Sequence, residues 1–233
     1  DQALADGAEL VGGIPAADQN PREHIDMVFT LAQKYNVDVD MHIDETDRAE
    51  CMTLEMLADA TVRMGWQGRV TAGHCCSLAA NPPERAGEVL RKVRNAGVRI
   101  VSLPSTNLYL QGRGDSYNVR RGIAPIGRIS REFQIPTAVA SDNIRDVFNP
   151  FGNGNLPEEA LIAAHGCHMG GTEGLELLFD MISRQPMEMF GVNPYLREGD
   201  EARFIICDAC TAAEVIVGHE KLFGSFTNNR MEV

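Results

Sequence analysis

The stretch VDVDMHIDETD, residues 37–47, decides how the rest of the sequence is interpreted. Its first half alternates apolar and polar residues, which is the period-two pattern of a strand with one buried face. Strands usually end in turn-forming residues, whereas this one ends in His42, Asp44 and Glu45. Imidazoles and carboxylates are groups that bind metal ions or move protons. The stretch therefore predicts a strand that carries reactive side chains at its C-terminal end.

The same order of strand, polar loop and amphipathic helix recurs along the chain. We expect strands at residues 10–14, 37–43, 69–74, 99–104 and 137–141. Helices are expected at residues 21–35, 48–64, 83–95, 122–133, 157–169 and 174–184. Strands that alternate with helices indicate parallel βα units, in either a closed barrel or a doubly wound sheet.

The positions of the polar residues favour the barrel. His42 ends the second expected strand, His74 ends the third, and Asp142 directly follows the fifth. Enzymes of the (β/α)₈ type place their chemistry at the C-terminal ends of the strands. We therefore predict an α/β fold, a TIM-type (β/α)₈ barrel that is incomplete here. About five of its eight βα units are present, so roughly three are expected to precede residue 1.

The alternation of expected strands and helices stops past residue 190. Three closely spaced strand-like runs follow, EARFIICDA at 201–209, AEVIVG at 213–218 and KLFGSF at 221–226. No helix is expected between them, which is typical of a small antiparallel sheet. The predicted organisation is a barrel portion at 1–190 and a small β appendage at 191–233.

Composition excludes several classes of protein. The 233 residues are 44% hydrophobic, which allows a substantial core, and no apolar run reaches the roughly 18 residues of a membrane span. A net charge of −12 argues against nucleic acid or an anionic membrane as partner. Six cysteines are too few for a disulfide scaffold, and we see no signal peptide. We expect a cytoplasmic homo-oligomer that acts on a small molecule.

Four segments carry a resemblance to a known family. They are HIDE at 42–45, GRVTAGH at 68–74, NLYLQGRGDSYNVRRG at 107–122 and ASDNIRD at 140–146. In order and spacing they resemble the amidohydrolase superfamily, and within it the cytosine deaminase group. The run GDEARFIICDA at 199–209 is similar to the segment in which such chains return to a small β-sandwich.

The resemblance implies a role for each residue of the site. His42 and Asp142 would be ligands of one divalent metal ion, zinc or iron, and Asp142 would also shuttle protons. Glu45 would protonate a ring nitrogen, and His74 would orient the water that the metal activates. Three further residues, Asn143, Gln111 and Phe148, are expected to bind the substrate.

Two departures from the family pattern stand out. The opening His-x-His of the family, which would supply two more metal ligands, is absent from this sequence. The metal site is therefore half built, and we expect this chain alone to be inactive. The second departure is Asn143, which stands where cytosine deaminases carry an aspartate. An amide donates as well as accepts hydrogen bonds, so this change alters which ring edge is read.

The resulting prediction is a metal-dependent hydrolytic deaminase that releases ammonia from a cytosine-like or pterin-like heterocycle. One alternative is hydrolysis of an N-alkylamine or amide bond on a triazine-type ring, and another is a non-catalytic homologue. Glu45 favours deamination, because a ring nitrogen must be protonated as water adds to the neighbouring carbon.

Other polar residues are assigned no chemistry. Asp44 and Asp47 are expected to be solvated, and the pair His165 and His168, at helical spacing, to be structural. The CxxC motif at 207–210 lies in a strand-like run, where residues three apart point to opposite faces. It is therefore expected to bind no zinc and to have no redox role.

Overall fold

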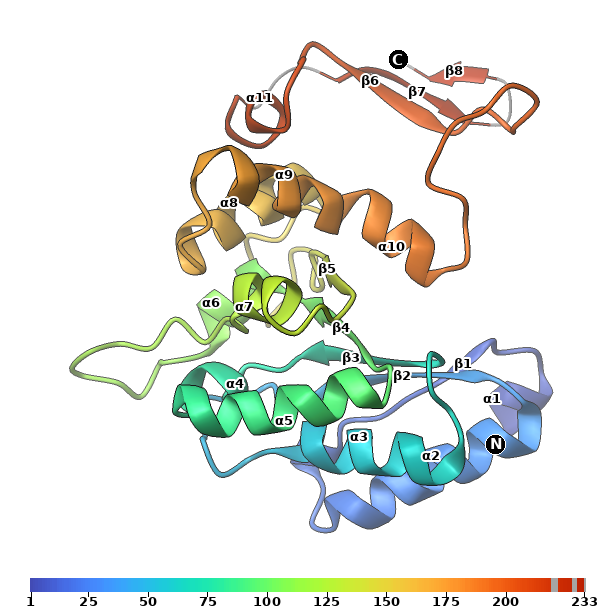
Figure 1. The fold of residues 1–233 in the computed structure, drawn as a ribbon, viewed down its shortest axis with the longest axis vertical. Helices are drawn as coiled ribbons and strands as arrows, with labels where there is room; N and C mark the ends of the chain where they lie inside the picture. Colours follow the sequence, from blue (N-terminus) through green and yellow to red (C-terminus); the bar gives the residue numbers. More distant parts are fainter. Residues whose placement is uncertain (219–221, 228–229, 233) are drawn as a thin grey trace.

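The centre of the molecule is a parallel sheet whose strands follow one another in chain order (Figure 1). The computed structural model describes residues 1–218, 222–227 and 230–232. The sheet consists of β1 (Leu10–Val11), β2 (Asp38–Ile43), β3 (Val70–His74), β4 (Arg99–Ser102) and β5 (Thr137–Val139). Each strand pairs in parallel with the next. The five strands are confirmed, and their order is the one expected of consecutive units in a (β/α)₈ barrel.

Helices cover one face of the sheet. Figure 1 shows α2 (Pro21–Tyr35), α3 (Thr53–Met64) and α5 (Pro83–Asn95) side by side against β1 to β4. In β2 the side chains of Val39, Met41 and Ile43 are buried toward this layer, whereas Asp40 and His42 are exposed on the other face. The period of two therefore separates the core from the side chains that could do chemistry.

The remaining helical elements connect the strands or follow the sheet. They are α1 (Gln2–Ala5), a 3₁₀ turn (Pro15–Ala17), α4 (Ser77–Ala80), α6 (Pro104–Leu110), α7 (Ile126–Arg131), α8 (Leu156–Gly166), α9 (Gly171–Ile182) and α10 (Arg184–Met189). Three of the short ones, α4, α6 and α10, were not expected from the sequence. The helix predicted at 48–64 begins only at Thr53, since residues 44–52 form the loop after β2.

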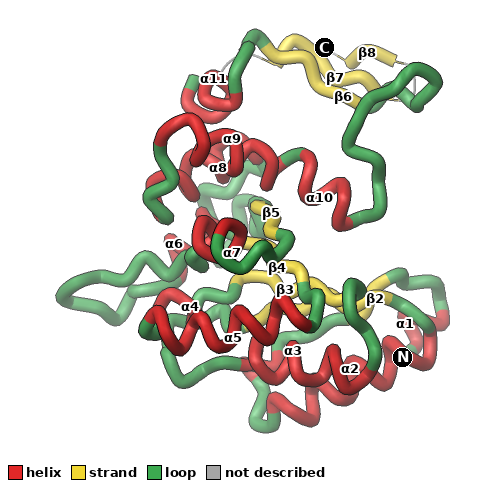
Figure 2. Tube along the Cα trace, in the orientation of Figure 1, coloured by secondary structure: helices red, strands yellow, loops and turns green. Residues whose placement is uncertain are grey.

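The C-terminal part holds a second sheet, antiparallel, in the order β6 (Phe204–Cys207), β7 (Leu222–Thr227) and β8 (Arg230–Glu232). In Figure 2 the helices α8 to α10 separate it from the parallel sheet. The antiparallel appendage is confirmed to this extent, and its completion into a β-sandwich stays a prediction. Part of KLFGSF, Lys221, lies outside the described residues.

One predicted strand is wrong, because AEVIVG forms the helix α11 (Ala212–Val217). The hydroxyl of Thr211 accepts from the backbone N–H of Glu214 at 3.2 Å, and the Glu214 carboxylate accepts from the backbone N–H of Thr211 at 3.2 Å. This reciprocal capping box starts a helix, and the buried Ile216 then packs with α8 and α9. An apolar run of six residues fits a strand or a helix equally well, and the cap decides between them.

No helix within the described residues is long and apolar enough to cross a lipid bilayer.

The capping box gives a test of the corrected element. Thr211→Ala should lower the free energy of unfolding by about 1 kcal/mol, because it removes an N-cap. Thr30→Ala is the matched control, since Thr30 is exposed in the middle of α2 and its hydroxyl only bonds the Asp26 carbonyl. Denaturant unfolding of both variants provides the measurement. Equal effects of the two changes would show that the cap does not stabilise α11.

Candidate active site

The backbone adopts left-handed conformations at the ends of three strands, and these conformations set the directions of the side chains there. Four residues there have positive φ without being glycine: Asp44 at 50°, His74 at 70°, Cys75 at 54° and Asp142 at 62°. Left-handed conformations cost energy in residues that carry a Cβ, and they concentrate at functional sites. Two of these four strained positions, His74 and Asp142, are ones at which the sequence predicts chemistry.

Two imidazoles meet at the end of β2 and β3. Ile43 is paired with His74 across these strands, so His42 precedes His74 by one position in the register. Nε2 of His74 lies 2.8 Å from Nδ1 of His42, a hydrogen-bond distance. Glu45, in the loop after β2, places Oε1 3.6 Å from Nδ1 of His74. One donor atom from each of His42, Glu45 and His74 lies within 4.8 Å of the others.

Burial keeps His74 neutral. Its side chain is 1% exposed, and this burial, together with the nearby His42, lowers the pKa of His74 to about 3. A hydrogen bond with the buried Asn107 opposes the shift without cancelling it. At neutral pH the ring is therefore uncharged, with Nε2 facing His42 and Nδ1 facing Asn107, so one of these contacts has to give way before His74 bonds a metal ion or a water.

Burial acts on Glu45 in the opposite sense. Loss of solvent and then the charge of Asp142 raise the pKa of Glu45 to about 7. The pKa of Asp142 is also raised by burial, an effect that His42 opposes. Asp142 thus interacts electrostatically with both Glu45 and His42. The ligand atoms of His42, Glu45 and His74 therefore lie together, whereas Asp142 is not part of that close group and acts on Glu45 and His42 through its charge. The roles of all four stay predictions.

The positions of the three residues expected to bind substrate do not by themselves assign them that role. The Asn143 amide donates to the Asp146 carboxylate at 2.6 Å, which leaves its carbonyl oxygen as an acceptor. Phe148 is 55% exposed in the loop after β5. Gln111 is the C-cap of α6, and its side chain packs so closely against Gly122 that a Cβ there would clash with it. Contact of the three with a substrate stays a prediction.

The expectation that Asp44 is solvated is wrong, and Asp47 is solvated only in part. Asp44 is fully buried, and its carboxylate accepts four hydrogen bonds, from Thr53 N–H at 2.8 Å, Thr53 Oγ1 at 2.6 Å, Leu54 N–H at 3.0 Å and the Cys51 thiol at 3.4 Å. It thereby caps α3 from nine residues away, a distance that no local capping pattern reveals. Asp47 is partly exposed and pairs with Arg120 at 3.5 Å.

Asn107 is a site residue that the sequence alone did not single out. It begins the motif at 107–122, and this is the signal that could have identified it. Its Nδ2 lies 3.0 Å from Nδ1 of His74, and its buried Oδ1 has no partner among the described residues. Exchange of the amide oxygen and nitrogen would let Asn107 accept a hydrogen bond from the His74 Nδ1–H instead.

Neither the pair His165 and His168 nor the CxxC motif belongs to the group of His42, Glu45 and His74. Helix α8 ends at Gly166, so His165 and His168 do not share a helical face, and His168 instead contacts the Arg121 guanidinium. Cys207 ends β6 and Cys210 follows it, and both thiols are free.

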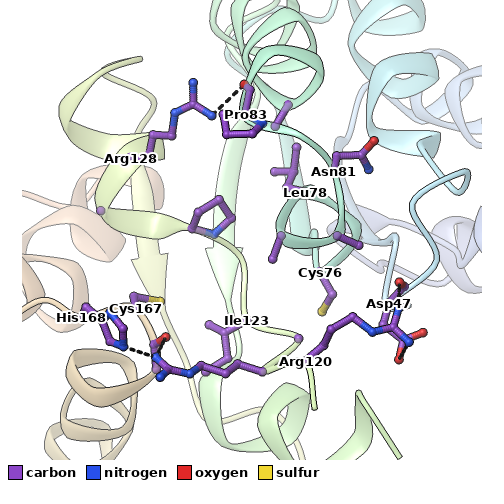
Figure 3. Close-up of a pocket in the computed structure, with 18 residues that line it drawn as sticks. Asp47, Cys76, Leu78, Asn81, Pro83, Arg120, Ile123, Arg128, Cys167 and His168 are labelled. Atoms are coloured by element: carbon purple, nitrogen blue, oxygen red, sulfur yellow. Dashed lines mark hydrogen bonds and ion pairs between the residues drawn. The ribbon is translucent and has the colours of Figure 1, made fainter. Parts of the chain in front are cut away.

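A cavity of about 540 Å³ lies beside the candidate site (Figure 3). Its walls come from the segment after β3, from residues 120–128 and from the end of α8, with Cys76, Leu78 and Ile123 among them. None of the four clustered side chains lines it. Its Arg120 and Arg128 are engaged with Asp115 and Glu132, respectively.

The clustered residues suit a divalent metal ion. Two imidazoles and carboxylates from a rigid sheet edge are the donors that zinc and iron take in hydrolases. His74 is neutral for the reason given above, and the exposed His42 has its Nε2 turned away from the contact with His74. The donor types do not distinguish zinc from iron.

Comparison with known proteins decides the family. The sequence profile of the amidohydrolase family matches residues 1–221. The chain belongs to the amidohydrolase family. Its structure superimposes on 5-methylcytosine deaminase from Klebsiella pneumoniae liganded with phosphonocytosine, with a TM-score of 0.94 and 30% identity, over 100% of this chain and 58% of that one. The predicted resemblance to the cytosine deaminase group is confirmed.

Two curated relatives widen the comparison. Pterin deaminase from Rhizobium rhizogenes is 39% identical over 145 residues, 62% of this chain and 33% of that protein. N-isopropylammelide isopropyl amidohydrolase from Pseudomonas sp. strain ADP is 28% identical over 236 residues, 100% of this chain and 55% of that protein. This amidohydrolase chain therefore spans about one third to three fifths of the length of the relatives that it matches.

The opposite effects of burial on Glu45 and His74 can be tested by NMR titration of the metal-free protein. The Glu45 carboxyl should titrate near pH 7, and the His74 ring should stay neutral down to about pH 4. Because the folded-state pKa of Glu45 exceeds the ordinary 4.5, its contribution to stability is lost as pH rises from about 4.5 to 7. Titration of Glu45 near pH 4.5 would contradict the burial of its carboxyl beside Asp142.

Proposed function

We propose that this amidohydrolase chain is part of a hydrolytic deaminase that removes an exocyclic amino group from a pterin-type or cytosine-type heterocycle and releases ammonia. The observation that carries the proposal is Glu45, a half-buried carboxyl whose pKa is raised to about 7 beside a neutral His74. A carboxyl of this kind is protonated about half of the time at neutral pH, whereas ordinary surface carboxylates are almost fully ionised.

The reaction needs a nucleophile and an acid. His42 and Asp142 would hold a divalent metal ion, which would supply the Lewis acidity that makes water nucleophilic at neutral pH. Glu45 gives its proton to the ring nitrogen next to the C–NH₂ carbon as water adds there. His74 would orient the water, and Asp142 takes one proton from the water and passes it to the departing amine. The proton of the remaining hydroxyl returns to Glu45 as ammonia leaves and the ring carbonyl forms.

The relatives support this class of substrate. Pterin deaminase and 5-methylcytosine deaminase both act on an amino group attached to a nitrogen-containing ring, and both match this chain at 30% identity or more. Such rings present a cyclic amidine, in which the protonated nitrogen adjoins the carbon that water attacks. Glu45 has a proton to give at this position.

A second candidate is hydrolysis of an alkylamine from a triazine-type ring. The relative N-isopropylammelide isopropyl amidohydrolase matches the whole chain, which favours this reading. A non-catalytic homologue is the least favoured, because a chain that only binds has no need of His42, Glu45, His74 and Asp142 clustered together. The product distinguishes the two reactions, ammonia in one and an alkylamine in the other.

The role of Glu45 can be tested by Glu45→Gln in the full-length enzyme. The variant should bind as much metal as wild type and lower kcat by about 10² to 10⁴, because the amide cannot act as the acid. Glu50→Gln, an exposed position in the same loop, is the matched control and should keep wild-type kcat. Unchanged turnover in Glu45→Gln would remove this residue from the mechanism.

The substrate class can be tested by an ammonia-release screen of the full-length enzyme against pterins, pyrimidines and N-alkylaminotriazines. We expect ammonia from a pterin or a pyrimidine, with Asn143→Asp shifting kcat/KM toward cytosine, since a carboxylate only accepts hydrogen bonds. Release of alkylamine with no ammonia would favour the second candidate. A substrate profile that does not move in Asn143→Asp would show that Asn143 does not read the ring.

A further inference from the structure

Strand β4 stands between the two strands that carry His74 and Asp142, yet its own end supplies no ionisable side chain. The chain passes instead from Ser102 through Leu103 into the short helix α6. The first polar residues of that helix are consecutive: Ser105, Thr106 and Asn107. Each of them makes a hydrogen bond to a different element, and two of those bonds reach the candidate site.

Asn107 reaches toward β3. It is fully buried, and its amide nitrogen lies 3.0 Å from Nδ1 of His74. The other ring nitrogen of His74 faces His42 at 2.8 Å. The imidazole is therefore held at both of its nitrogens, which fixes the plane of the ring.

Thr106 reaches toward β5. It is fully buried, and its hydroxyl donates to the carbonyl of Ser141 at 3.3 Å, the residue before Asp142. Burial raises the pKa of Asp142, and a hydrogen bond from Thr106 opposes that rise. Thr106 thus contacts the turn in which Asp142 adopts its left-handed backbone.

Glu159 holds the start of α6 in place through hydrogen bonds from Ser105. This residue of α8 is 3% exposed, and its carboxylate accepts from the Ser105 N–H at 3.0 Å and from the Ser105 hydroxyl. It forms no ion pair within the described residues, and the proposed reaction does not use it. Asn149, also buried, donates to Ser105 Oγ at 2.9 Å and to Thr106 Oγ1 at 3.2 Å.

We propose that Thr106 and Asn107 are positioning residues that hold Asp142 and His74 in their reactive arrangement, and that Ser105, Glu159 and Asn149 fix Thr106 and Asn107 in place. The inference rests on the proposed function for the roles of His74 and Asp142. Burial of the Glu159 carboxylate without a cation costs free energy. Hydrogen bonds from Ser105, the residue before Thr106, offset that cost. Partners behind metal ligands typically change metal affinity or activity by about 10- to 100-fold when removed.

The test compares Thr106→Val with Thr106→Ser in the full-length enzyme. The matched control is Thr61→Val, because Thr61 is equally buried and its hydroxyl bonds only the Leu57 carbonyl inside α3. Measurements are kcat, KM, zinc affinity by competition with a chromophoric chelator, and Tm. Asn107→Leu is measured in the same way, so the proposal stays testable if Thr106→Val does not fold.

Thr106→Val should lower kcat or zinc affinity by about 10- to 100-fold with little change in KM. Thr106→Ser should recover most of the loss, and Thr61→Val should lower Tm alone. The proposal is overturned if Thr106→Val and Asn107→Leu match Thr61→Val in kcat and zinc affinity, or if Thr106→Ser is as impaired as Thr106→Val.

The outcomes also distinguish this inference from the proposed function. A wild-type enzyme that binds zinc and releases no ammonia in the screen would overturn the deaminase assignment. Weaker zinc binding in Thr106→Val and unchanged binding in Thr61→Val would still support the positioning role.

Discussion

The buried carboxylate of Asp44 is the interaction on which the site depends. Its two oxygens accept from the first turn of α3, while its carbonyl accepts from the backbone N–H groups of Cys76 at 3.0 Å and Ser77 at 3.4 Å. One residue thus joins the end of β2, the start of α3 and the segment that follows His74. Glu45 is its neighbour in the chain, so the position of Glu45 relative to His74 follows from this junction.

Burial then sets the protonation of the two groups that flank the junction. The same loss of solvent disfavours a cation on His74 and an anion on Glu45, so His74 is neutral at pH 7 and Glu45 is partly protonated. An uncharged imidazole and a carboxyl that retains a proton near neutral pH arise from one physical cause. The parallel sheet contributes the other requirement, because the carboxyl ends of its strands lie at one edge.

Local signals predicted the parts of the fold that depend on local interactions. Both α2 and α5 have the predicted bounds, since Asn20 caps the first and Gly97 follows the second in a left-handed turn. The strands were recognisable from their apolar patterns. The buried state of Asp44 was not, because its partners Thr53 and Leu54 lie nine and ten residues away. Pairing between distant residues leaves no periodic trace in a single sequence.

The proposed deamination and the alternative dealkylation would use most of the same residues. They differ in whether a ring nitrogen has to receive a proton. Both reactions add water to a ring carbon and expel an amine, so both need an activated water and a group like Asp142 to carry its proton. Only the step at the ring nitrogen calls for an acid that is protonated at neutral pH. Glu45 meets that requirement because it is half-buried and faces the charge of Asp142. A solvated glutamate at the same position would be ionised and could not donate, so the burial of this one side chain favours deamination.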